Sequence, residues 1–243
     1  MVSIIKNPAA KYCVCRTHDG PLRTGESQRS LPAKRYFFIA LVALIATFAG
    51  TVEPDQKNDF VEAARKQIGK TLLYDPSYQV IDYPNGDVPI DRGVCTDVVI
   101  RALRAACNYD LQEFVHEDME KNFSKYPQIW GLDHPDKNID HRRVPNLQTF
   151  FERNGWSLPL SNQPSKYKPG DIVTCIVPPS LPHIMIVSDK RSQDNIPLVI
   201  HNIGNGAKEE NILFEYKITG HYRIKGIEPC VSADRQGRSA STE

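Results

Sequence analysis

The spacing of apolar residues changes near residue 170 from a helical period to a strand-like one. Before that point, residues 59–70, 94–111 and 144–154 carry apolar side chains three and four positions apart, and a further helix is expected around residues 115–123. After it come five short segments rich in β-branched residues and separated by Pro, Gly, Asp or Asn: residues 171–177, 183–190, 197–203, 212–218 and 221–224. Helices followed by strands predict an α+β fold, with N-terminal helices packed on a C-terminal antiparallel sheet.

The chain of 243 residues has the length of one globular unit, and its 40% content of hydrophobic residues is enough to bury a core. We place this unit at residues 57–226 and expect it to be a monomer. Residues 227–243 are rich in Ser, Arg, Gln and Gly, which predicts a disordered tail.

The segment at residues 36–50 is uncharged, contains no proline and follows Lys34 and Arg35. Its 15 residues are short for a membrane span, which takes about 20, and match the apolar part of a secretion signal. Cleavage after Ala49 fits a signal peptide. Because the leader at residues 1–35 is long for a signal, two alternatives stay open: an uncleaved anchor in the inner membrane, and a true start site further along the chain.

The leader also carries most of the positive charge. It holds seven Lys or Arg residues against two Asp or Glu, a net charge of +5, so the rest of the chain carries about −4. Positive charge before the apolar segment places the domain outside the cytoplasm, in the periplasm or beyond it. The rest of the chain has no basic stripe with interleaved aromatic residues, so we expect no nucleic-acid partner.

The six cysteines do not form a pattern of disulfide bonds. Cys13 and Cys15 lie in the leader and Cys230 in the tail, while Cys95 and Cys107 would be about 18 Å apart on one helix, too far for a disulfide. Cys175 lies in an apolar strand and is interpreted as a core residue. Cys95 is therefore expected to be a free thiol in an oxidising compartment.

Cys95 falls in the first turn of the helix predicted at residues 94–111. A helix N-terminus lowers the pKa of a thiol, and only the thiolate attacks a carbonyl carbon. Gly93 lets the chain turn into the helix, and the backbone N–H groups of Cys95 and Thr96 would stabilise an oxyanion. The alternative is an inert cysteine buried in an amphipathic helix.

Two histidines are candidates for the base that a thiol needs. His183 opens a strand after Pro182, and His201 stands near the end of the next strand, where antiparallel pairing would bring it beside His183. Either His201 or Asn202 would hold the imidazole in the required tautomer. Taken singly, such histidines are more often structural residues.

Metal chemistry is not expected. The chain contains neither an HExxH motif nor paired CxxC motifs, and the segment His116-Glu117-Asp118 has no second set of ligands at metal spacing. We therefore predict no metal and no cofactor.

The segments GVCTDVVIRALR, NIDHRRVPNLQTFF, KPGDIV, HI-x-IVSD and PLVIHNIG, the last followed by ITGHYR, occur in this order across residues 57–226. Together they resemble the YijF-like family of bacterial envelope proteins, a domain of unknown function placed in the NlpC-type branch of the papain-like cysteine peptidases. The resemblance implies that fold, with Cys95 as nucleophile, His183 as base and His201 as the third polar residue. It also implies an upstream tyrosine at the oxyanion site, for which Tyr74, Tyr78 and Tyr83 qualify.

One departure from the NlpC-type pattern concerns the residues after the nucleophile. Many such enzymes have Asp-Cys-Ser-Gly, in which the Cys is the nucleophile and Gly stands two residues after it. This chain has Asp97 two residues after Cys95. Asp97 would bind a substrate amine or pair with Arg101 one turn along, and we favour the pairing. The segment at residues 140–143, Asp-His-Arg-Arg, would bind a substrate carboxylate in the cleft or form a solvated loop.

These features lead to three hypotheses about function. The first is an exported thiol hydrolase that cleaves amide bonds of peptidoglycan stem peptides, the substrate class that the resemblance implies. The second is a non-catalytic envelope-binding module on the same fold. The third is an acyltransferase, which the sequence does not separate from a hydrolase because both pass through a thioester.

Overall fold

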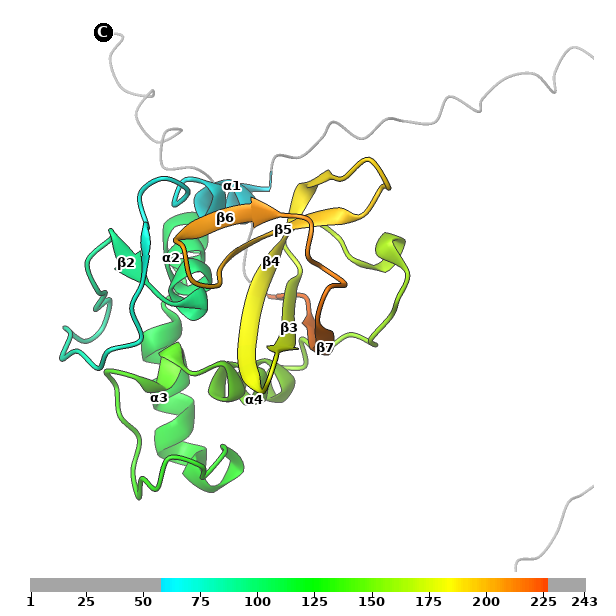
Figure 1. The fold of residues 1–243 in the computed structure, drawn as a ribbon. Helices are drawn as coiled ribbons and strands as arrows, with labels where there is room; N and C mark the ends of the chain where they lie inside the picture. The colour runs from blue at the N-terminus through cyan, green and yellow to red at the C-terminus, as the bar shows by residue number, and fades with distance from the viewer. Residues whose placement is uncertain (1–57, 227–243) are drawn as a thin grey trace, which may run out of the picture. The chain divides into compact units, whose positions relative to one another are not determined.

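The computed structural model describes residues 58–226, shown in colour in Figure 1. The expectations for residues 1–35, 36–50 and 227–243 lie outside this range. Within it, no helix combines the length and the apolar character needed to cross a membrane. The α-helices are α1 (Asp59–Arg65), α2 (Cys95–Cys107), α3 (Leu111–Asn122) and α4 (Val144–Arg153), and the short 3-10 helices are η1 (Phe123–Lys125), η2 (Asp140–Arg142) and η3 (Pro164–Lys166).

The helices are followed by a five-stranded sheet in which every neighbouring pair of strands is antiparallel. Its order is β6-β5-β4-β3-β7, and a separate two-residue parallel pair joins β1 to β2. The strands are β1 (Leu73–Tyr74), β2 (Arg92–Gly93), β3 (Ile172–Val177), β4 (Leu181–Arg191), β5 (Pro197–Asn202), β6 (Ala207–Glu210) and β7 (Lys217–Tyr222). The predicted mixture of helices and antiparallel strands is thus confirmed.

The C-terminal part of the sheet differs from the prediction. Residues 212–216 form a turn instead of the beginning of a strand, and β7 combines the end of that predicted strand with the start of the next one. The sequence analysis also missed β6, whose residues are Ala-Lys-Glu-Glu. Charged side chains are common on edge strands because they discourage pairing with other chains, so a search for β-branched residues overlooks such a strand.

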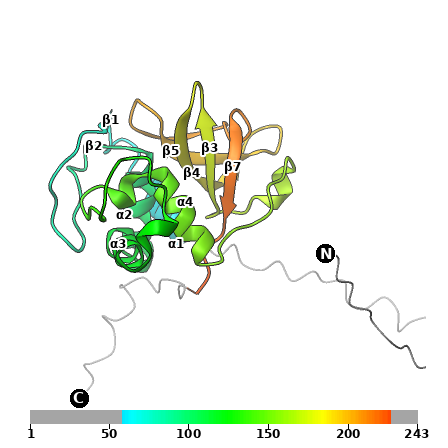
Figure 2. The same ribbon diagram turned by 90° about the horizontal axis from the view of Figure 1, so that it is seen from below.

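The two faces of the sheet pack against different partners. On one face, Ile184, Ile186 and Ile200 join a core cluster that includes Val98 and Leu103 of α2. Figure 2 shows the helices gathered on this side of the sheet. On the other face the buried residues belong to a second cluster: Tyr167, Val173, Cys175, Met185, Val187, Val199 and Leu213.

The helix α2 positions the candidate nucleophile. Its apolar face is fully buried against α1 and the sheet, and it ends at Asn108, which adopts the left-handed conformation with φ of 49°. Contacts of α2 with β4 and β5 place its first residue, Cys95, beside the sheet. Cys95 and Cys175 are free thiols, and Cys175 is buried in the second cluster.

Candidate active site

The first turn of α2 is fixed by Asp97. Its Oδ2 accepts the backbone N–H of Val94, the residue before the helix, at 2.6 Å. This contact supplies an acceptor for one of the amide groups that a helix start leaves without an intrahelical partner. The side chain of Asp97 is 4% exposed, so its contacts are made inside the protein.

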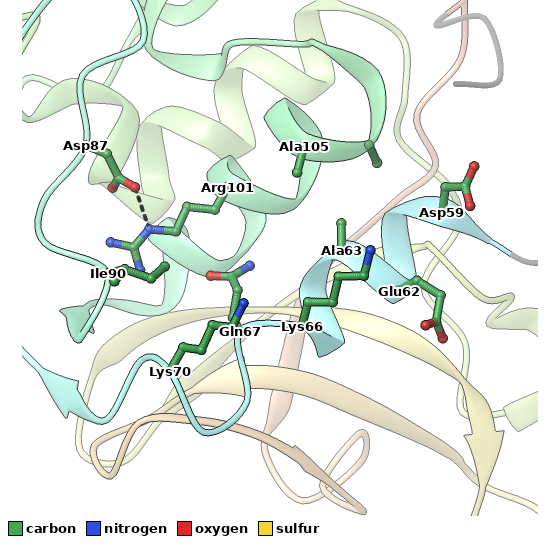
Figure 3. A pocket seen from close by; sticks show the side chains of 11 residues that line it. Asp59, Glu62, Ala63, Lys66, Gln67, Lys70, Asp87, Ile90, Arg101 and Ala105 are labelled. Atoms are coloured by element: carbon green, nitrogen blue, oxygen red, sulfur yellow. Dashed lines mark hydrogen bonds and ion pairs between the residues drawn. The ribbon is translucent and has the colours of Figure 1, made fainter. Parts of the chain in front are cut away.

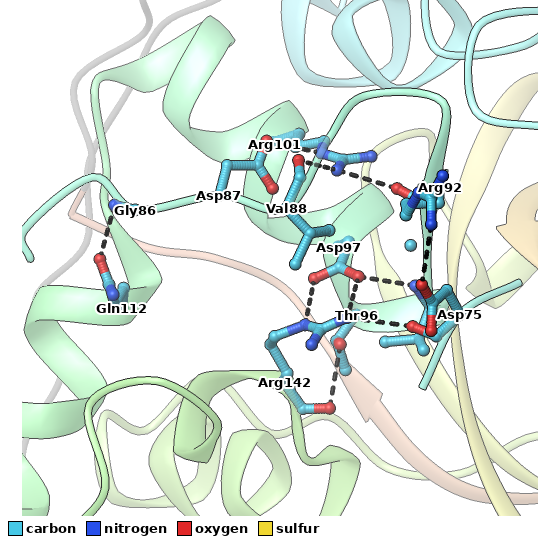
Figure 4. Close-up of polar contacts among 12 residues, drawn as sticks. Asp75, Gly86, Asp87, Val88, Arg92, Thr96, Asp97, Arg101, Gln112 and Arg142 are labelled. Atoms are coloured by element: carbon cyan, nitrogen blue, oxygen red, sulfur yellow. Dashed lines mark hydrogen bonds and ion pairs between the residues drawn. The ribbon is translucent and has the colours of Figure 1, made fainter. Parts of the chain in front are cut away.

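Asp97 is paired with Arg142, as Figure 4 shows. Both oxygens of Asp97 accept from the guanidinium, each at 2.9 Å, and the side chain of Arg142 is 3% exposed. Arg142 also donates to the backbone carbonyls of Asp75 and Ser77. The predicted pair of Asp97 with Arg101 is therefore wrong.

Arg101 instead pairs with Asp87 at 2.7 Å and donates to the carbonyls of Val88, Pro89 and Arg92. It holds the segment that precedes the helix. The sequence analysis missed this because spacing along one helix does not reveal partners supplied by other segments, such as Asp87 and Arg142.

Replacing Gly93 with alanine is expected to lower the free energy of unfolding by about 1–3 kcal/mol more than the same change at Gly69, since overpacking costs this much. A Cβ at Gly93 would lie 2.8 Å from Oδ2 of Asp97, whereas one at Gly69 would meet nothing within 4 Å. Gly69 has a φ of 77° and Gly93 a φ of 157°, so Gly69→Ala controls for a methyl group added at positive φ, and the greater backbone strain at Gly93 adds to its packing cost. Urea unfolding measures the difference; equal losses would contradict the packing argument.

The sulfur of Cys95 is deeply buried, with the residue 3% exposed. Burial raises the pKa of the Cys95 thiol to about 12, although the backbone N–H groups of Ile184, Thr96 and Cys95 itself act in the opposite direction. The sequence analysis expected a lowered pKa from the helix N-terminus. The direction is reversed because removing the thiolate from water costs more free energy than the hydrogen bonds from the nearby N–H groups supply.

The sulfur meets β4 at the point where the pairing of β4 with β5 ends. The last ladder pair on this side joins Ile186 to β5. The N–H of Val187 donates to Asp171, on the β3 side of the strand. Because N–H groups alternate in direction along an antiparallel strand, the N–H of Ile184 points toward β5, and there it faces the sulfur of Cys95.

His183 and His201 lie on the neighbouring strands β4 and β5 and contact each other. Nε2 of His183 is 3.0 Å from Nδ1 of His201, and the two rings meet edge to face. Nε2 of His201 is 3.1 Å from Oε2 of Glu210 on β6. His201 is thus the side chain that holds the imidazole of His183.

The sulfur and the imidazole pair lie at the same end of the β4–β5 ladder. His183 directly precedes Ile184, whose N–H faces the sulfur of Cys95. Among the hydrogen bonds of residues 58–226, none joins Cys95 to His183. Catalytic hydrogen bonds are often long in enzymes without substrate. The structure therefore places the backbone of His183 next to the amide that faces the sulfur, and the imidazole of His183 contacts His201.

The resting state of this group is uncharged at pH 7. Burial, together with the neighbouring His201, lowers the pKa of His183 to about 3. Burial also lowers the pKa of His201, against the opposing charge of Glu210. Because the pKa of the Cys95 thiol is about 12, Cys95 is a neutral thiol at pH 7 and His183 is a neutral imidazole.

A groove of about 450 Å³ opens at Cys95, and its lining is mostly apolar. Its walls come from the segment after β1, the start of α2, the loop before η2 and the start of β4. Its lining includes Tyr74, Cys95, Trp130, Arg142, Arg143, Leu181 and Pro182. Leu181 is 49% exposed, so the rim offers an apolar surface beside the thiol.

Of the three candidate tyrosines, Tyr74 is the one that lines the groove with Cys95. Burial, reinforced by the negative charge that Cys95 would carry, raises the pKa of Tyr74 to about 12. The hydroxyl of Tyr78 instead donates to Asp136 and accepts from Asn138. The structure therefore points to Tyr74, and the sequence analysis could not choose because all three precede Cys95 in one irregular segment.

Thr96 and Asn202 were candidates for substrate or oxyanion contacts. Both side chains instead donate hydrogen bonds to backbone carbonyls inside the protein. The hydroxyl of Thr96 donates to the carbonyl of Arg142 at 3.1 Å. The amide of Asn202 donates to the carbonyls of Gly93 and Leu73 at 2.9 and 3.3 Å. Asn202 thus ties β5 to the segment that precedes the nucleophile, and does not contact the imidazole.

The segment at residues 140–143 contributes to the groove without offering a free charge. Arg142 is paired with Asp97, and Arg143 pairs with Asp140 at 2.9 Å. The guanidinium of Arg143 also lies 4.2 Å from the ring centre of Trp130. The expectation of a solvated loop is wrong, because Asp140, His141 and Arg142 are buried.

A second pocket, of about 430 Å³, lies between α1, the segment after it and α2 (Figure 3). Lys66, Lys70 and Arg101 contribute to its lining, and Arg101 is already paired with Asp87. No cysteine or histidine lines this pocket. No group of three or more His, Cys, Asp or Glu within residues 58–226 has a metal-binding arrangement.

The fold and site define a mixed α and β domain whose first long helix begins with a buried cysteine and whose sheet carries two paired histidines on β4 and β5. The family described as Domain of unknown function (DUF1287) matches residues 61–224, so the chain belongs to this family. Uncharacterized protein YijF of Escherichia coli (strain K12) is 52% identical over 198 residues, which cover 76% of this chain and 96% of that relative. The expected YijF-like family is therefore confirmed.

Proposed function

We propose that this chain is an exported cysteine hydrolase with the NlpC-type papain-like arrangement, and that it cleaves an amide bond in peptides of the cell envelope. The observation that carries the proposal is that His183, paired with His201, directly precedes Ile184, whose N–H faces the sulfur of Cys95 beside a groove of about 450 Å³. A helix-start cysteine, a histidine on the second strand of the main sheet and a polar residue on the next strand follow the order expected of this class. Peptidoglycan stem peptides are the substrate class that the resemblance implies.

The reaction would begin with the transfer of the thiol proton of Cys95 to Nδ1 of His183 as the sulfur bonds to the carbonyl carbon. The electrons of the C=O bond move to oxygen, where backbone N–H groups at the start of α2 stabilise the oxyanion. When the oxyanion collapses, the C–N bond breaks and the leaving amine takes the proton from His183. The product of this half-reaction is a thioester on Cys95.

In the second half-reaction, His183 accepts a proton from water as the water oxygen attacks the thioester. The C–S bond then breaks, the acid leaves, and the proton returns to the sulfur of Cys95. Attack by an amine in place of water would give acyl transfer from the same intermediate. His201 keeps the imidazole of His183 oriented in both halves, through the hydrogen bond of 3.0 Å.

One observation favours a second function, a non-catalytic binding module. Cys95 is 3% exposed, and burial raises its pKa to about 12, as expected for an inert thiol. In that case the groove would bind an envelope peptide without cleaving it. The two functions differ in whether His183 influences the reactivity of the sulfur.

Incubation of the purified full chain with muropeptides and with neutral apolar peptides is expected to yield new fragments, identified by mass. The Cys95→Ala variant should yield none, because Cys95 is the described cysteine that lines the groove. Cys107→Ala, at the other end of the same helix, is the matched control and should retain the fragments. Identical product profiles for the wild type and Cys95→Ala would exclude the hydrolase.

Alkylation of Cys95 by iodoacetamide separates the two functions without a substrate. In a hydrolase the reaction should slow when His183 is replaced by alanine, since the imidazole accepts the thiol proton. In a binding module the sulfur should alkylate at the same slow rate with and without that imidazole.

A further inference from the structure

Two hydrogen bonds link three side chains on successive strands of the sheet. Nε2 of His183 lies 3.0 Å from Nδ1 of His201, and Nε2 of His201 lies 3.1 Å from Oε2 of Glu210. The side chain of His201 is 0% exposed and that of Glu210 is 38% exposed, so the chain of contacts runs from the buried site to the surface. The role of Glu210 follows from the chemistry of these three groups.

A carboxylate only accepts hydrogen bonds, so Nε2 of His201 must carry the proton in its contact with Glu210. A neutral imidazole has a single N–H group, so Nδ1 of His201 is then an acceptor. It can contact His183 only if Nε2 of His183 carries a proton. Nδ1 of His183 then carries a free lone pair, and it is the atom that must accept the thiol proton.

We infer that Glu210 is a positioning residue, which sets the tautomers of His201 and His183 so that Nδ1 of His183 is the free base. This inference rests on the proposed function of Cys95 and His183. Burial keeps both imidazoles neutral, which is the condition under which tautomers matter.

The position of Glu210 is set by the sheet. In the β5–β6 ladder it pairs with Val199, two residues before His201, so it shares a face with His201. The other charges that act on His201 are those of Lys208 and Glu215, besides Glu210 itself. Lys208 and Glu215 make no hydrogen bond to His201 within the part of the chain that the structure describes.

Glu209 is a matched control on the same strand. Its carboxylate points to the other side of β6, where it pairs with Arg65 at 2.9 Å and with Lys190 at 2.8 Å and accepts from Ser188. The change Glu209→Ala therefore removes a carboxylate of the same strand without touching the imidazole pair.

The first test is the tautomeric state of the histidines in the full-length wild type, read from ¹⁵N chemical shifts at pH 7. We expect His183 and His201 to be neutral, each with a proton on Nε2 and none on Nδ1. In Glu210→Ala the tautomers of His201 should mix, whereas Glu210→Gln should preserve them because its amide oxygen still accepts. A proton on Nδ1 of His183 in the wild type would overturn the inference.

The second test is the rate of iodoacetamide alkylation of Cys95 across pH 6–9. Glu210→Ala should slow it about tenfold, a small part of the roughly 10²–10⁴-fold that a positioned base supplies, while Glu210→Gln and Glu209→Ala stay near the wild type. Equal rates in Glu210→Ala and wild type, or an equal loss in Glu209→Ala, would refute the role. If no substrate is cleaved and the tautomers still depend on Glu210, the proposed function fails and the tautomer assignment stands.

Discussion

Replacing Asp97 with alanine is expected to lower the free energy of unfolding by about 3–5 kcal/mol, since this is the cost of breaking a buried ion pair by removing one partner. The change leaves the guanidinium of Arg142 inside the protein without its two hydrogen bonds of 2.9 Å. It also removes the acceptor of the Val94 N–H at the start of α2. Urea unfolding monitored by circular dichroism measures the loss.

The double variant Asp97→Ala/Arg142→Met should recover most of this loss, because no unpaired charge then stays buried. The matched surface pair is Asp91 with Arg92, whose side chains are 51% and 38% exposed. Asp91→Ala should change the stability by less than about 1 kcal/mol. A loss at Asp97 no larger than that at Asp91, or no recovery in the double variant, would show that the pair does not hold the site.

Acidification from pH 7.5 to 4.5 is expected to destabilise the fold strongly, because three buried histidines must stay neutral in it. Burial lowers the pKa of His141 to about 4 and that of His183 to about 3, and it lowers the pKa of His201 as well. The unfolded chain binds protons at these sites near pH 6.5, before the folded chain does. The stabilisation is therefore complete above that pH and is lost as the pH falls toward the folded values.

At 1.36 kcal/mol per pH unit, His141 and His183 should each contribute about 2–3 kcal/mol to this loss over the interval. Asp140 acts in the opposite direction, since burial raises its pKa. Urea unfolding at each pH measures the slope of stability against pH. His141→Gln should make the slope shallower, and the same change at His134, whose side chain is 79% exposed, is the matched control. An unchanged slope in His141→Gln would contradict the burial argument.

Local sequence patterns predicted the elements that carry the candidate site. The helical period predicted a helix at residues 94–111 with Cys95 in its first turn, and the structure has α2 at Cys95–Cys107. The strand-like period predicted that His183 and His201 lie on successive strands. In the structure, Nε2 of His183 lies 3.0 Å from Nδ1 of His201. These features are local because the turn before a helix and the alternation along a strand depend on neighbouring residues.

Other parts of the site depend on residues far apart in the sequence. The pairing of Asp97 with Arg142 joins positions 45 residues apart, and no periodic pattern connects them. Glu210 stood in a charged segment without a strand pattern, so its contact with His201 became visible only with the β5–β6 ladder. Tyr74 could be separated from Tyr78 only by the walls of the groove.

The sequence by itself determined which residue types carry the chemistry and on which elements they lie, since helix starts and strand periods are written in short stretches of chain. Only the tertiary structure decided the partners of these residues and the direction of their pKa shifts. The dipole at the start of α2 favours a thiolate at Cys95, but the packing of β4 and β5 around the sulfur excludes water and raises the pKa to about 12. The desolvation of an atom depends on all the groups packed around it, so it is determined only when residues distant in the sequence pack against that atom.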